Sequence, residues 1–462
     1  MIPARLQPLL RATGVPARVA QRFAAAGHEA FLVGGGVRDA LLGREREETE
    51  YDFTTAAPPD VIHELLEGWA QGVVTVGKEF GTIGARLDGV LVEVTTFRSE
   101  VYRDDSRKPS VEFTDDLATD LSRRDFTVNA LALRIVPEPE IIDPHGGLVD
   151  LGSGLLRTPL SPEIAFGDDP LRMLRLYRFV STLGFVPDPA ALAAAAAMSD
   201  RLVIVSAERI REELDRLMVG DHVEAALWGV VESGLAEHFI PEIPALALEQ
   251  DPRHSHKDVL AHTIAVVGKC PPDRIVRLAA LFHDVGKPQT REVGPEGVSF
   301  HHHEVVGARM TRSRLQELRY PKDDVDDVVD LVYLHMRPHT FKLGWSDRAV
   351  RRYVRDAGHL LERLNTLVRC DVTTANDKKA RQIQRGIDEM ERRIAELRQQ
   401  EEIDSIRPPL DGHAVMQHLA LAPGPMVGEA LDMLLEHRLD HGPLSEEEAL
   451  GLLDRWWAER QQ

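Results

Sequence analysis

The chain has 462 residues, of which 43% are apolar and 28% are charged. This length and composition are typical of a soluble protein with about three globular units. Its 55 basic and 75 acidic side chains give a formal net charge of −20, which excludes a histone-like or polybasic RNA-coating protein. Any contact with nucleic acid must therefore use Lys and Arg residues gathered in one place.

Two further features bear on where the protein works. Only two cysteines occur, Cys270 and Cys370, so a disulfide framework is excluded and a reducing cytoplasm is favoured. The N-terminal segment carries scattered arginines without an apolar core, unlike a signal peptide, and no segment approaches the roughly 20 apolar residues of a membrane span. We therefore expect a cytoplasmic protein without a membrane partner.

The chain divides by pattern into a mixed head and a helical remainder. Four segments rich in Val, Ile, Thr and Phe predict strands at residues 30–33, 52–55, 81–87 and 90–97. From about residue 162 the pattern is helical almost throughout, including a charged stretch at 378–402. We expect an α+β protein with a small mixed sheet in its head and an all-α remainder. The expected domains are 1–140, 141–245, 246–380 and 381–462.

A glycine-rich turn follows the first predicted strand. Gly34, Gly35 and Gly36 separate this strand from a predicted helix. Glycines let backbone amides approach an anion closely, and the N-terminus of a helix favours phosphate. Arg38 would lie in the first helical turn, within reach of a triphosphate. Because glycine turns after strands are common, an ordinary turn explains this segment about equally well by itself.

Three acidic residues lie within predicted strands. Glu50 and Asp52 are two positions apart in one strand, so their side chains project from the same face. Glu93 lies inside a second, apolar strand. Carboxylates within strands are costly unless a cation joins them, and Mg²⁺ held by carboxylates and substrate phosphates removes that cost. A solvated strand face would explain each residue singly, but the three together predict a magnesium site.

Such a site suits nucleotidyl transfer, because metal ions held by shared carboxylates can activate a 3′-hydroxyl and stabilise the departing pyrophosphate. Residues 121–130 add Arg123, Arg124 and Asn129, side chains that can contact a triphosphate and a ribose. A chance pair of arginines on a surface helix is the alternative interpretation.

Residues 168–178 predict the start of a helix, with a proline in its first turn and aspartates at its N-terminal end. Asp169 and Arg172 are three residues apart, and Arg175 and Arg178 continue along that side. A carboxylate beside a guanidinium can read a base edge that has an amino donor next to a ring-nitrogen acceptor. Cytosine and adenine share this pattern, whereas uracil and guanine lack it. An ordinary surface salt bridge would have the same spacing.

These motifs, in this order and spacing, resemble class II CCA-adding tRNA nucleotidyltransferases, members of the DNA polymerase β-like superfamily. The resemblance is closest to bacterial members with an added His-Asp (HD) domain, and it covers nearly the whole chain. It implies a polymerase β-like head that holds Mg²⁺ through Glu50 and Asp52, with Glu93 as the third acidic residue. The nucleotide site that it implies consists of Gly35, Arg38, Arg124, Asp169, Arg172, Arg175 and Arg178.

The resemblance implies template-independent addition of CCA to the 3′ end of tRNA from CTP and ATP, with release of pyrophosphate. Residues 102–109 resemble the flexible loop that CC-only enzymes lack, and the tail resembles the C-terminal region of the family. Two positions depart from the family pattern. Glu50 stands where the family has Asp, which adds a methylene beside the metal, and Asp168 stands where the family usually has Glu.

The helical remainder contains a second set of residues suited to metal binding: His262, His283, Asp284, His303, His335 and Asp371. Histidines and aspartates from several helices can converge on one or two divalent metals. The series resembles the HD phosphohydrolase superfamily. It implies that His262, His283, Asp284 and Asp371 hold one metal, Mg²⁺ or a transition metal, and that His303 and His335 hold another or contact phosphate. His301, His302 and His339 fit a polar surface better.

Two other functions stay open at the level of sequence. The first is a poly(A) polymerase on the same head, because residues 77–80 superficially resemble the basic signature of those enzymes, although Glu79 stands where a second basic residue is expected. The second is a non-catalytic, RNA-binding head attached to an active HD phosphohydrolase.

Overall fold

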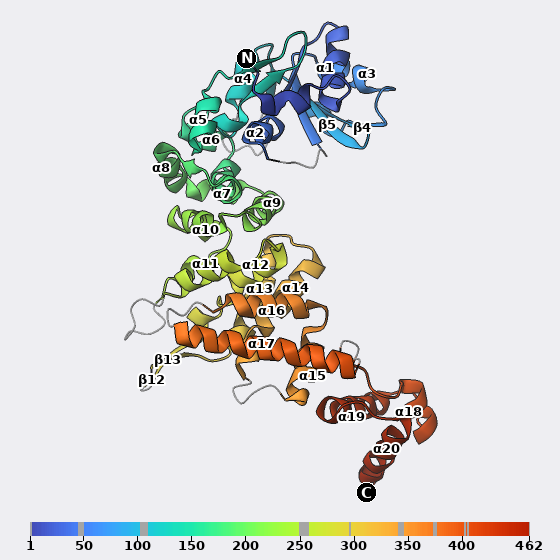
Figure 1. The fold of residues 1–462 in the computed structure, drawn as a ribbon. Coiled ribbons are helices and arrows are strands. Elements are labelled where there is room, and N and C mark those ends of the chain that lie inside the picture. Colours follow the sequence, from blue (N-terminus) through green and yellow to red (C-terminus); the bar gives the residue numbers. More distant parts are fainter. Residues whose placement is uncertain are drawn as a thin grey trace. The chain divides into compact units, whose positions relative to one another are not determined.

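The computed structural model describes residues 2–44, 50–101, 110–248, 258–294, 297–340, 346–372, 377–401, 403 and 406–461. The chain forms two compact units, Met1–Pro241 and Glu242–Gln462. The first unit holds a sheet covered by helices, and the second is almost entirely helical (Figure 1). The expected α+β class, with a mixed sheet in the head followed by helices, is confirmed.

A seven-stranded sheet forms the centre of the first unit, in the order β3-β4-β5-β2-β1-β8-β9. Its strands are β1 (Ala30–Val33), β2 (Glu50–Thr55), β3 (Gly72–Val74), β4 (Thr82–Leu87), β5 (Val90–Thr96), β8 (Ala132–Arg134) and β9 (Glu140–Ile142). β2 and β5 run parallel and the other neighbours run antiparallel. The β2–β5 register pairs Asp52 with Glu93, so the sheet itself brings two predicted acidic residues together.

The four predicted strands correspond to β1, β2, β4 and β5, with ends that agree within two residues. A separate two-stranded ribbon consists of β6 (Arg98–Val101) and β7 (Ser110–Phe113). The predicted flexible loop at 102–109 falls between these two strands and lies outside the described residues. The helices of the head are η1 (Ala4–Leu10), α1 (Val15–Ala25), α2 (Gly35–Leu42), α3 (Pro59–Leu66), η2 (Lys78–Phe80), α4 (Leu117–Ser122) and η3 (Thr127–Asn129).

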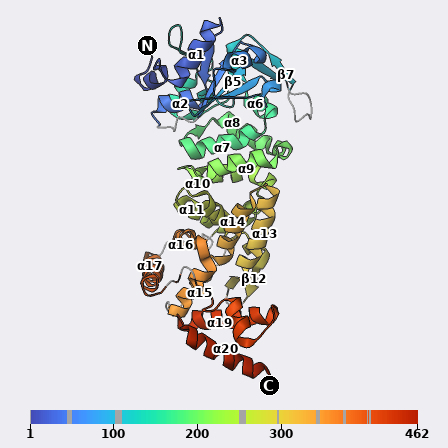
Figure 2. The same cartoon turned by 90° about the vertical axis from the view of Figure 1, so that its right-hand side faces the viewer.

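A helical neck completes the first unit. It contains α5 (Gly147–Ser153), α6 (Pro162–Asp168), α7 (Leu171–Leu183), α8 (Pro189–Ala197), η4 (Ser199–Ile204), α9 (Ala207–Met218), α10 (Val223–Glu232) and η5 (Leu235–His238), with the short strands β10 (Leu155–Leu156) and β11 (Val186–Pro187). In both views α7 and α9 lie side by side (Figures 1 and 2). Asp169 is the C-cap of α6 and Pro170 is the N-cap of α7, so the predicted base-reading segment lies at a break between two helices.

The second unit begins with a bundle made of η6 (Pro244–Leu246), α11 (Val259–Lys269), α12 (Arg274–Phe282), η7 (Lys287–Thr290), α13 (His303–Glu317), α14 (Lys322–Leu334), η8 (Arg337–Thr340), α15 (Asp347–Ala357), η9 (Gly358–Leu360) and α16 (Leu361–Cys370). The hairpin of β12 (Arg291–Gly294) and β13 (Gly297–Phe300) interrupts it, contrary to the purely helical expectation. β12 is exposed along its whole length, so no alternation of buried and polar residues marks it in the sequence.

The long helix α17 (Asp377–Gln400) corresponds to the charged stretch predicted to be helical, and Figure 2 views it nearly along its axis. Arg369 on α16 pairs with Glu391 on α17, with 2.6 Å between the guanidinium and the carboxylate. The chain continues through α18 (Gly412–Leu419), α19 (Pro425–His441) and α20 (Glu446–Gln461), which share an apolar core. No helix in the described part of the chain combines the length and apolar character that a membrane span requires.

Candidate functional site

The three acidic residues of the head converge. One carboxylate oxygen from each of Glu50, Asp52 and Glu93 lies within 4.8 Å of the other two, and all three side chains are half-buried. Burial and the neighbouring charges of Asp52 and Glu50 raise the pKa of Glu93 above its ordinary value. Three carboxylates gathered in this way repel one another unless a cation joins them, so this donor set fits a hard divalent ion such as Mg²⁺.

The glycine turn brings the start of α2 against these carboxylates. Gly34 has a φ of +72°, and a Cβ at this position would lie 3.5 Å from both Asp52 Oδ2 and Arg124 Nη1. The positive φ would therefore strain any side chain here, and its Cβ would be in contact with both Asp52 and Arg124. Gly35 follows as the first residue of α2, so the free amides of the helix end are next to the acidic cluster.

Arg38 is buried and connects α2 to residues 121–130. Its Nη1 donates to Asn129 Oδ1 at 2.7 Å, and Asn129 Nδ2 donates to Asp125 Oδ1 at 2.9 Å. Asp120, which is fully buried, accepts from Arg123 Nε at 3.0 Å and lies 3.7 Å from Arg124 Nη2. The predicted triphosphate and ribose contacts therefore belong to two buried polar groups in the head, one around Asp125 and Asn129 and one around Asp120.

The group around Asp125 continues into the neck. Asp125 Oδ2 accepts from Arg175 Nη2 at 2.6 Å, and Glu213 on α9 pairs with both Arg175 and Arg178, at 3.2 and 2.7 Å. Burial of the Asp125 carboxylate would raise its pKa, but the charge of Arg175 and the bond from Asn129 hold the pKa well below its ordinary range. Burial, together with the charge of Arg175, lowers the pKa of Arg178 to about 10.

An aromatic ring lies among the same cations. The guanidinium carbons of Arg38, Arg175 and Arg178 are 5.1, 5.8 and 3.8 Å from the centre of the Phe179 ring. Phe179 also packs edge-on against Phe126, at 5.6 Å between ring centres. Contacts between cations and an aromatic face are favourable when desolvated. The ring therefore helps to hold one head arginine and two neck arginines close together.

The predicted base-reading residues have partners that the sequence did not indicate. Asp169 Oδ2 pairs with Arg209 Nη2 on α9 at 2.7 Å. The buried Arg172 guanidinium donates to the backbone carbonyls of Ala165, at 3.1 Å, and Arg123. The salt bridge suggested by the spacing of Asp169 and Arg172 is thus replaced by separate supports for each side chain. The sequence analysis did not identify Arg209, Glu213 or Asp125 as site residues, because each of them pairs with a residue that is distant in the sequence.

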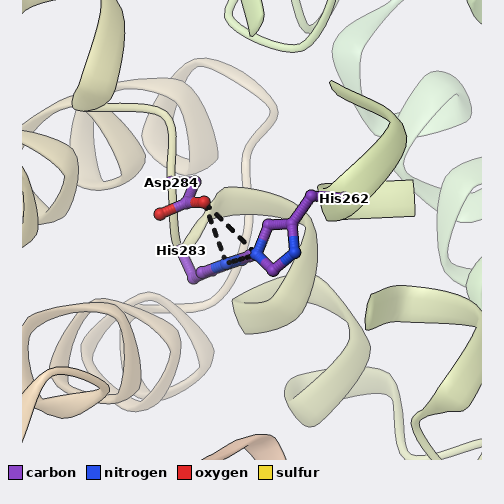
Figure 3. A group of neighbouring side chains, drawn as sticks. All are labelled: His262, His283 and Asp284. Atoms are coloured by element: carbon purple, nitrogen blue, oxygen red, sulfur yellow. Dashed lines mark hydrogen bonds and ion pairs between the residues drawn. The ribbon is translucent and has the colours of Figure 1, made fainter. Parts of the chain in front are cut away.

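In the second unit the predicted HD residues form two overlapping groups. Ligand atoms of His262, His283 and Asp284 lie within 4.8 Å of one another (Figure 3), and so do those of Asp284, His303 and His335. Asp371 joins the first group, since its Oδ1 lies 3.0 Å from His262 Nε2. The structure therefore brings all six predicted residues together, with Asp284 common to both groups.

The orientation of the rings fits metal binding. His283, His303 and His335 each place Nδ1 at 2.6–2.9 Å from a backbone carbonyl three residues earlier, which marks Nδ1 as the donor and leaves the Nε2 lone pair for a ligand. Yet Nε2 of His303 lies 3.3 Å from Nε2 of His335, and Nε2 of His262 lies 3.2 Å from Nε2 of His283. Facing lone pairs need a proton or a metal between them, so these residues fit one or two divalent ions.

The charges at this centre are strongly coupled. Burial lowers the pKa of His283 by itself, but the carboxylates of Asp284 and Asp371 raise it to about 10. Burial and the nearby His283 lower the pKa of His335 to about 3. Lys287 Nζ donates to Asp284 Oδ2 at 2.6 Å. Lys287 was not predicted as a site residue, although its position three residues after Asp284 in the sequence was a usable signal.

The other histidines match the sequence interpretation where they are described. His301 and His302 are exposed, and 82% of the His302 side chain is accessible. The side chain of His339 lies outside the described residues.

Models of three protein families match three successive parts of the chain. A model of the poly A polymerase head domain matches residues 30–157. A model described as a probable RNA- and SrmB-binding site of polymerase A matches residues 184–246, and an HD domain model matches residues 259–376. The acidic cluster lies in the first of these regions, and the histidine cluster lies in the third.

Curated relatives include the A-adding tRNA nucleotidyltransferase of Deinococcus radiodurans, which is 34% identical over 92% of this chain and 95% of its own length. CCA-adding enzymes of Bacillus pumilus and Bacillus velezensis are 41% and 39% identical. Both of these matches cover 48% of this chain, and this chain spans about half the length of each enzyme, 52% and 53%.

Solved structures share the fold along the whole chain. The Bacillus stearothermophilus CCA-adding enzyme in complex with CTP has a TM-score of 0.72 at 24% identity, covering 100% of this chain and 99% of the other. The Thermotoga maritima CCA-adding enzyme complexed with tRNA has a TM-score of 0.60 at 16% identity, covering 98% of each chain. These structures show the shared fold, and the near full-length relative shows that the chain is an enzyme of the tRNA nucleotidyltransferase family, which includes CCA-adding and A-adding members.

Proposed function

We propose that this enzyme completes the 3′ CCA end of tRNA from CTP and ATP, without a nucleic-acid template, and releases pyrophosphate. The observation that carries the proposal is the convergence of Glu50, Asp52 and Glu93 next to the glycine turn and the buried arginines. This arrangement combines a divalent-metal site with cations for a triphosphate, which nucleotidyl transfer requires. Mg²⁺ at this site would lower the pKa of the attacking 3′-hydroxyl and neutralise charge on the triphosphate.

The chain's own residues bind and orient the nucleotide. Arg38 and Arg124 are fixed by Asn129 and Asp120, so their charges need little reorganisation to receive phosphate oxygens. Gly35, at the start of α2, provides backbone amides for the same anion. Arg175 and Arg178 are available from the neck, where Glu213 holds both guanidinium groups.

We propose that Asp169 and Arg172 select the base of the incoming nucleotide. The Asp169 carboxylate would accept from the amino group of cytosine or adenine, and Arg172 would donate to the adjacent ring nitrogen. Uracil and guanine present a carbonyl and an N–H at these places, so both contacts would be repulsive or unpaired. Before it binds a base the carboxylate is paired with Arg209, which supplies a compensating charge for this part-buried group.

The enzyme's product distinguishes this proposal from its alternatives. Purified protein is incubated with tRNA ending before CCA and with tRNA ending in CC, and each nucleotide is omitted in turn. We expect CTP alone to add two residues to the first tRNA, and both nucleotides together to add three. Addition of AMP to the CC-ending tRNA only would assign the A-adding reaction. ATP-dependent tailing of unrelated RNA would assign a poly(A) polymerase.

We propose as a second activity that the HD centre is a metal-dependent phosphohydrolase. The supporting observation is the facing Nε2 atoms of four histidines around Asp284, with Nδ1 of three rings held by backbone carbonyls. A divalent ion held by these residues would activate a water for attack on a phosphoester. Failure to hydrolyse phosphomonoesters and 2′,3′-cyclic nucleotides with Mn²⁺, Ni²⁺ or Co²⁺ would remove this activity.

Paired variants separate the two sites. Asp52→Asn should abolish nucleotide incorporation and leave any phosphohydrolase activity intact, whereas His283→Ala should do the reverse. Incorporation that survives Asp52→Asn would point to a non-catalytic head.

We also propose the four-domain division, with a nucleotide- and RNA-binding neck at 141–245 and a tRNA-binding tail at 381–462.

A further inference from the structure

The chain's only two cysteines meet in the second unit, although 100 residues separate them in the sequence. Cys270 directly follows α11 and Cys370 is the last residue of α16. The two thiols hydrogen-bond to each other. Lys269 Nζ donates to the carbonyl of Val372 at 2.7 Å, and Arg277 Nε donates to the carbonyl of Cys270 at 3.0 Å. Contacts on either side therefore hold the two thiols next to each other.

The same two helix ends carry part of the HD centre. His262 lies on α11, two turns before Cys270, and Asp371 directly follows Cys370. Their side chains are joined by the 3.0 Å contact between His262 Nε2 and Asp371 Oδ1. α11 and α16 are thus connected twice, once by candidate metal ligands and once by a thiol pair.

We propose that Cys270 and Cys370 form a redox-sensitive pair whose oxidation to a disulfide lowers the affinity of the HD centre for divalent metal. The effect on metal binding rests on the proposed HD function, whereas formation of the disulfide does not. Cys270 is 2% exposed and Cys370 is partly exposed, so an oxidant from solvent reaches Cys370 first.

A hydroperoxide of the H₂O₂ class is sufficient as the oxidant. The Cys370 sulfur attacks one peroxide oxygen, the O–O bond breaks, and sulfenic acid and one water are formed. The Cys270 sulfur then attacks the sulfenic sulfur, the S–S bond forms, and the S–O oxygen leaves as a second water. Two thiols lose two electrons and two protons, and the peroxide is reduced to two waters.

The coupling to metal binding follows from geometry. A disulfide draws the sulfurs from hydrogen-bonding distance to about 2.0 Å. Arg277 holds the backbone carbonyl of Cys270, and Asp371 directly follows Cys370 in the chain, so movement of the Cys370 side toward Cys270 also moves Asp371. Metal-ligand distances tolerate changes of only about 0.2 Å, so a displaced Asp371 carboxylate weakens the site.

The test uses the full chain carrying Asp52→Asn, so that Mn²⁺ titration reports on the HD centre without binding in the head. Reduced, metal-stripped protein is divided, and one half is treated with stoichiometric H₂O₂. We expect the count of free thiols to fall from two to none in a protein that stays monomeric on a non-reducing gel. The Kd for Mn²⁺ should rise at least tenfold, a size typical of disturbed ligand positioning, and reduction should restore it.

Matched controls are Cys270→Ser and Cys370→Ser in the same background, with circular-dichroism melting to confirm folding. In both, peroxide should change the Kd for Mn²⁺ less than twofold. Two thiols that persist after peroxide, a disulfide between molecules, or an internal disulfide with unchanged Mn²⁺ affinity would each overturn the proposal. Reduced protein that binds no Mn²⁺ would instead refute the HD metal site itself.

Discussion

The carboxylate of Asp169 is paired with the guanidinium of Arg209, 2.7 Å away on α9 and 40 residues later in the chain. Arg209 therefore supports the side chain that we propose to select the base. Its own side chain is 52% exposed, so the ion pair can open when a base arrives. Arg172, by contrast, is held by backbone carbonyls and is buried.

We expect Arg209→Ala to reduce the preference of the enzyme for CTP and ATP over UTP and GTP by roughly tenfold, about 1.4 kcal/mol. Without Arg209 the Asp169 carboxylate loses the contact that sets its position. Ratios of kcat/KM for the four nucleotides measure this. Arg201→Ala is the matched control, since Arg201 is exposed and donates to the Gly167 carbonyl at 3.1 Å. An equal loss of discrimination in both variants would contradict a specific role for Arg209.

Asp52→Asn should lower nucleotide incorporation by at least about 10³-fold while stabilising the metal-free protein. The activity falls because a metal-binding carboxylate is lost, and the stability rises because repulsion with Glu50 and Glu93 is relieved. Thermal melts with and without Mg²⁺ measure the second effect. The variant should melt higher than wild type without metal and should gain little from Mg²⁺. A lower metal-free melting temperature would show that the three carboxylates do not repel one another.

The raised pKa of Glu93 predicts a pH dependence of stability. The folded, metal-free protein holds this proton more tightly than the unfolded chain, for which the ordinary pKa is 4.5. Its stability should therefore fall as the pH rises from about 4.5 through the raised pKa. Mg²⁺ favours the ionised carboxylate, so the increase in melting temperature caused by Mg²⁺ should grow over that interval. Glu93→Gln should flatten both curves, and unchanged curves would contradict the assignment.

Metal binding at the HD centre should release a proton. In the metal-free protein the pKa of His283 is about 10, so His283 is protonated at pH 8, and a metal can bind its Nε2 only after the proton leaves. Calorimetry of Mn²⁺ binding in buffers of different ionisation enthalpy measures the number of protons released. The affinity should rise with pH up to about 10. Heats that do not depend on the buffer would show that His283 is not a ligand.

Asp125→Ala should destabilise the first unit by about 3 kcal/mol, because it leaves the part-buried Arg175 with one acidic partner fewer. The lowered pKa of Asp125 means that its contribution is present above the unfolded-state pKa and is lost as the pH falls through the folded value. Denaturant melts near neutral pH measure the difference. Glu140→Ala, which removes an exposed ion pair with Arg134, should cost less than about 1 kcal/mol.

The sequence by itself determined the order of the elements and indicated which side chains are suited to bind metal and nucleotide. Strand periodicity placed Glu50 and Asp52 on one face, and the apolar segment around Glu93 predicted its strand, because both properties depend on neighbouring residues. The HD series was likewise recognisable from residue types in order. The hairpin of β12 and β13 was missed because β12 is exposed and β13 is half-buried along its whole length, so neither strand alternates between buried and exposed residues.

Only the tertiary structure decided which side chains meet. The β2–β5 register placed Glu93 opposite Asp52, and the packing of α9 against α7 placed Glu213 next to Arg175. The packing of α11 near α16 brought Cys270 to Cys370. Local periodicity fixes the face on which a side chain lies, whereas its partner depends on how distant elements pack, and that depends on interactions summed over the whole core.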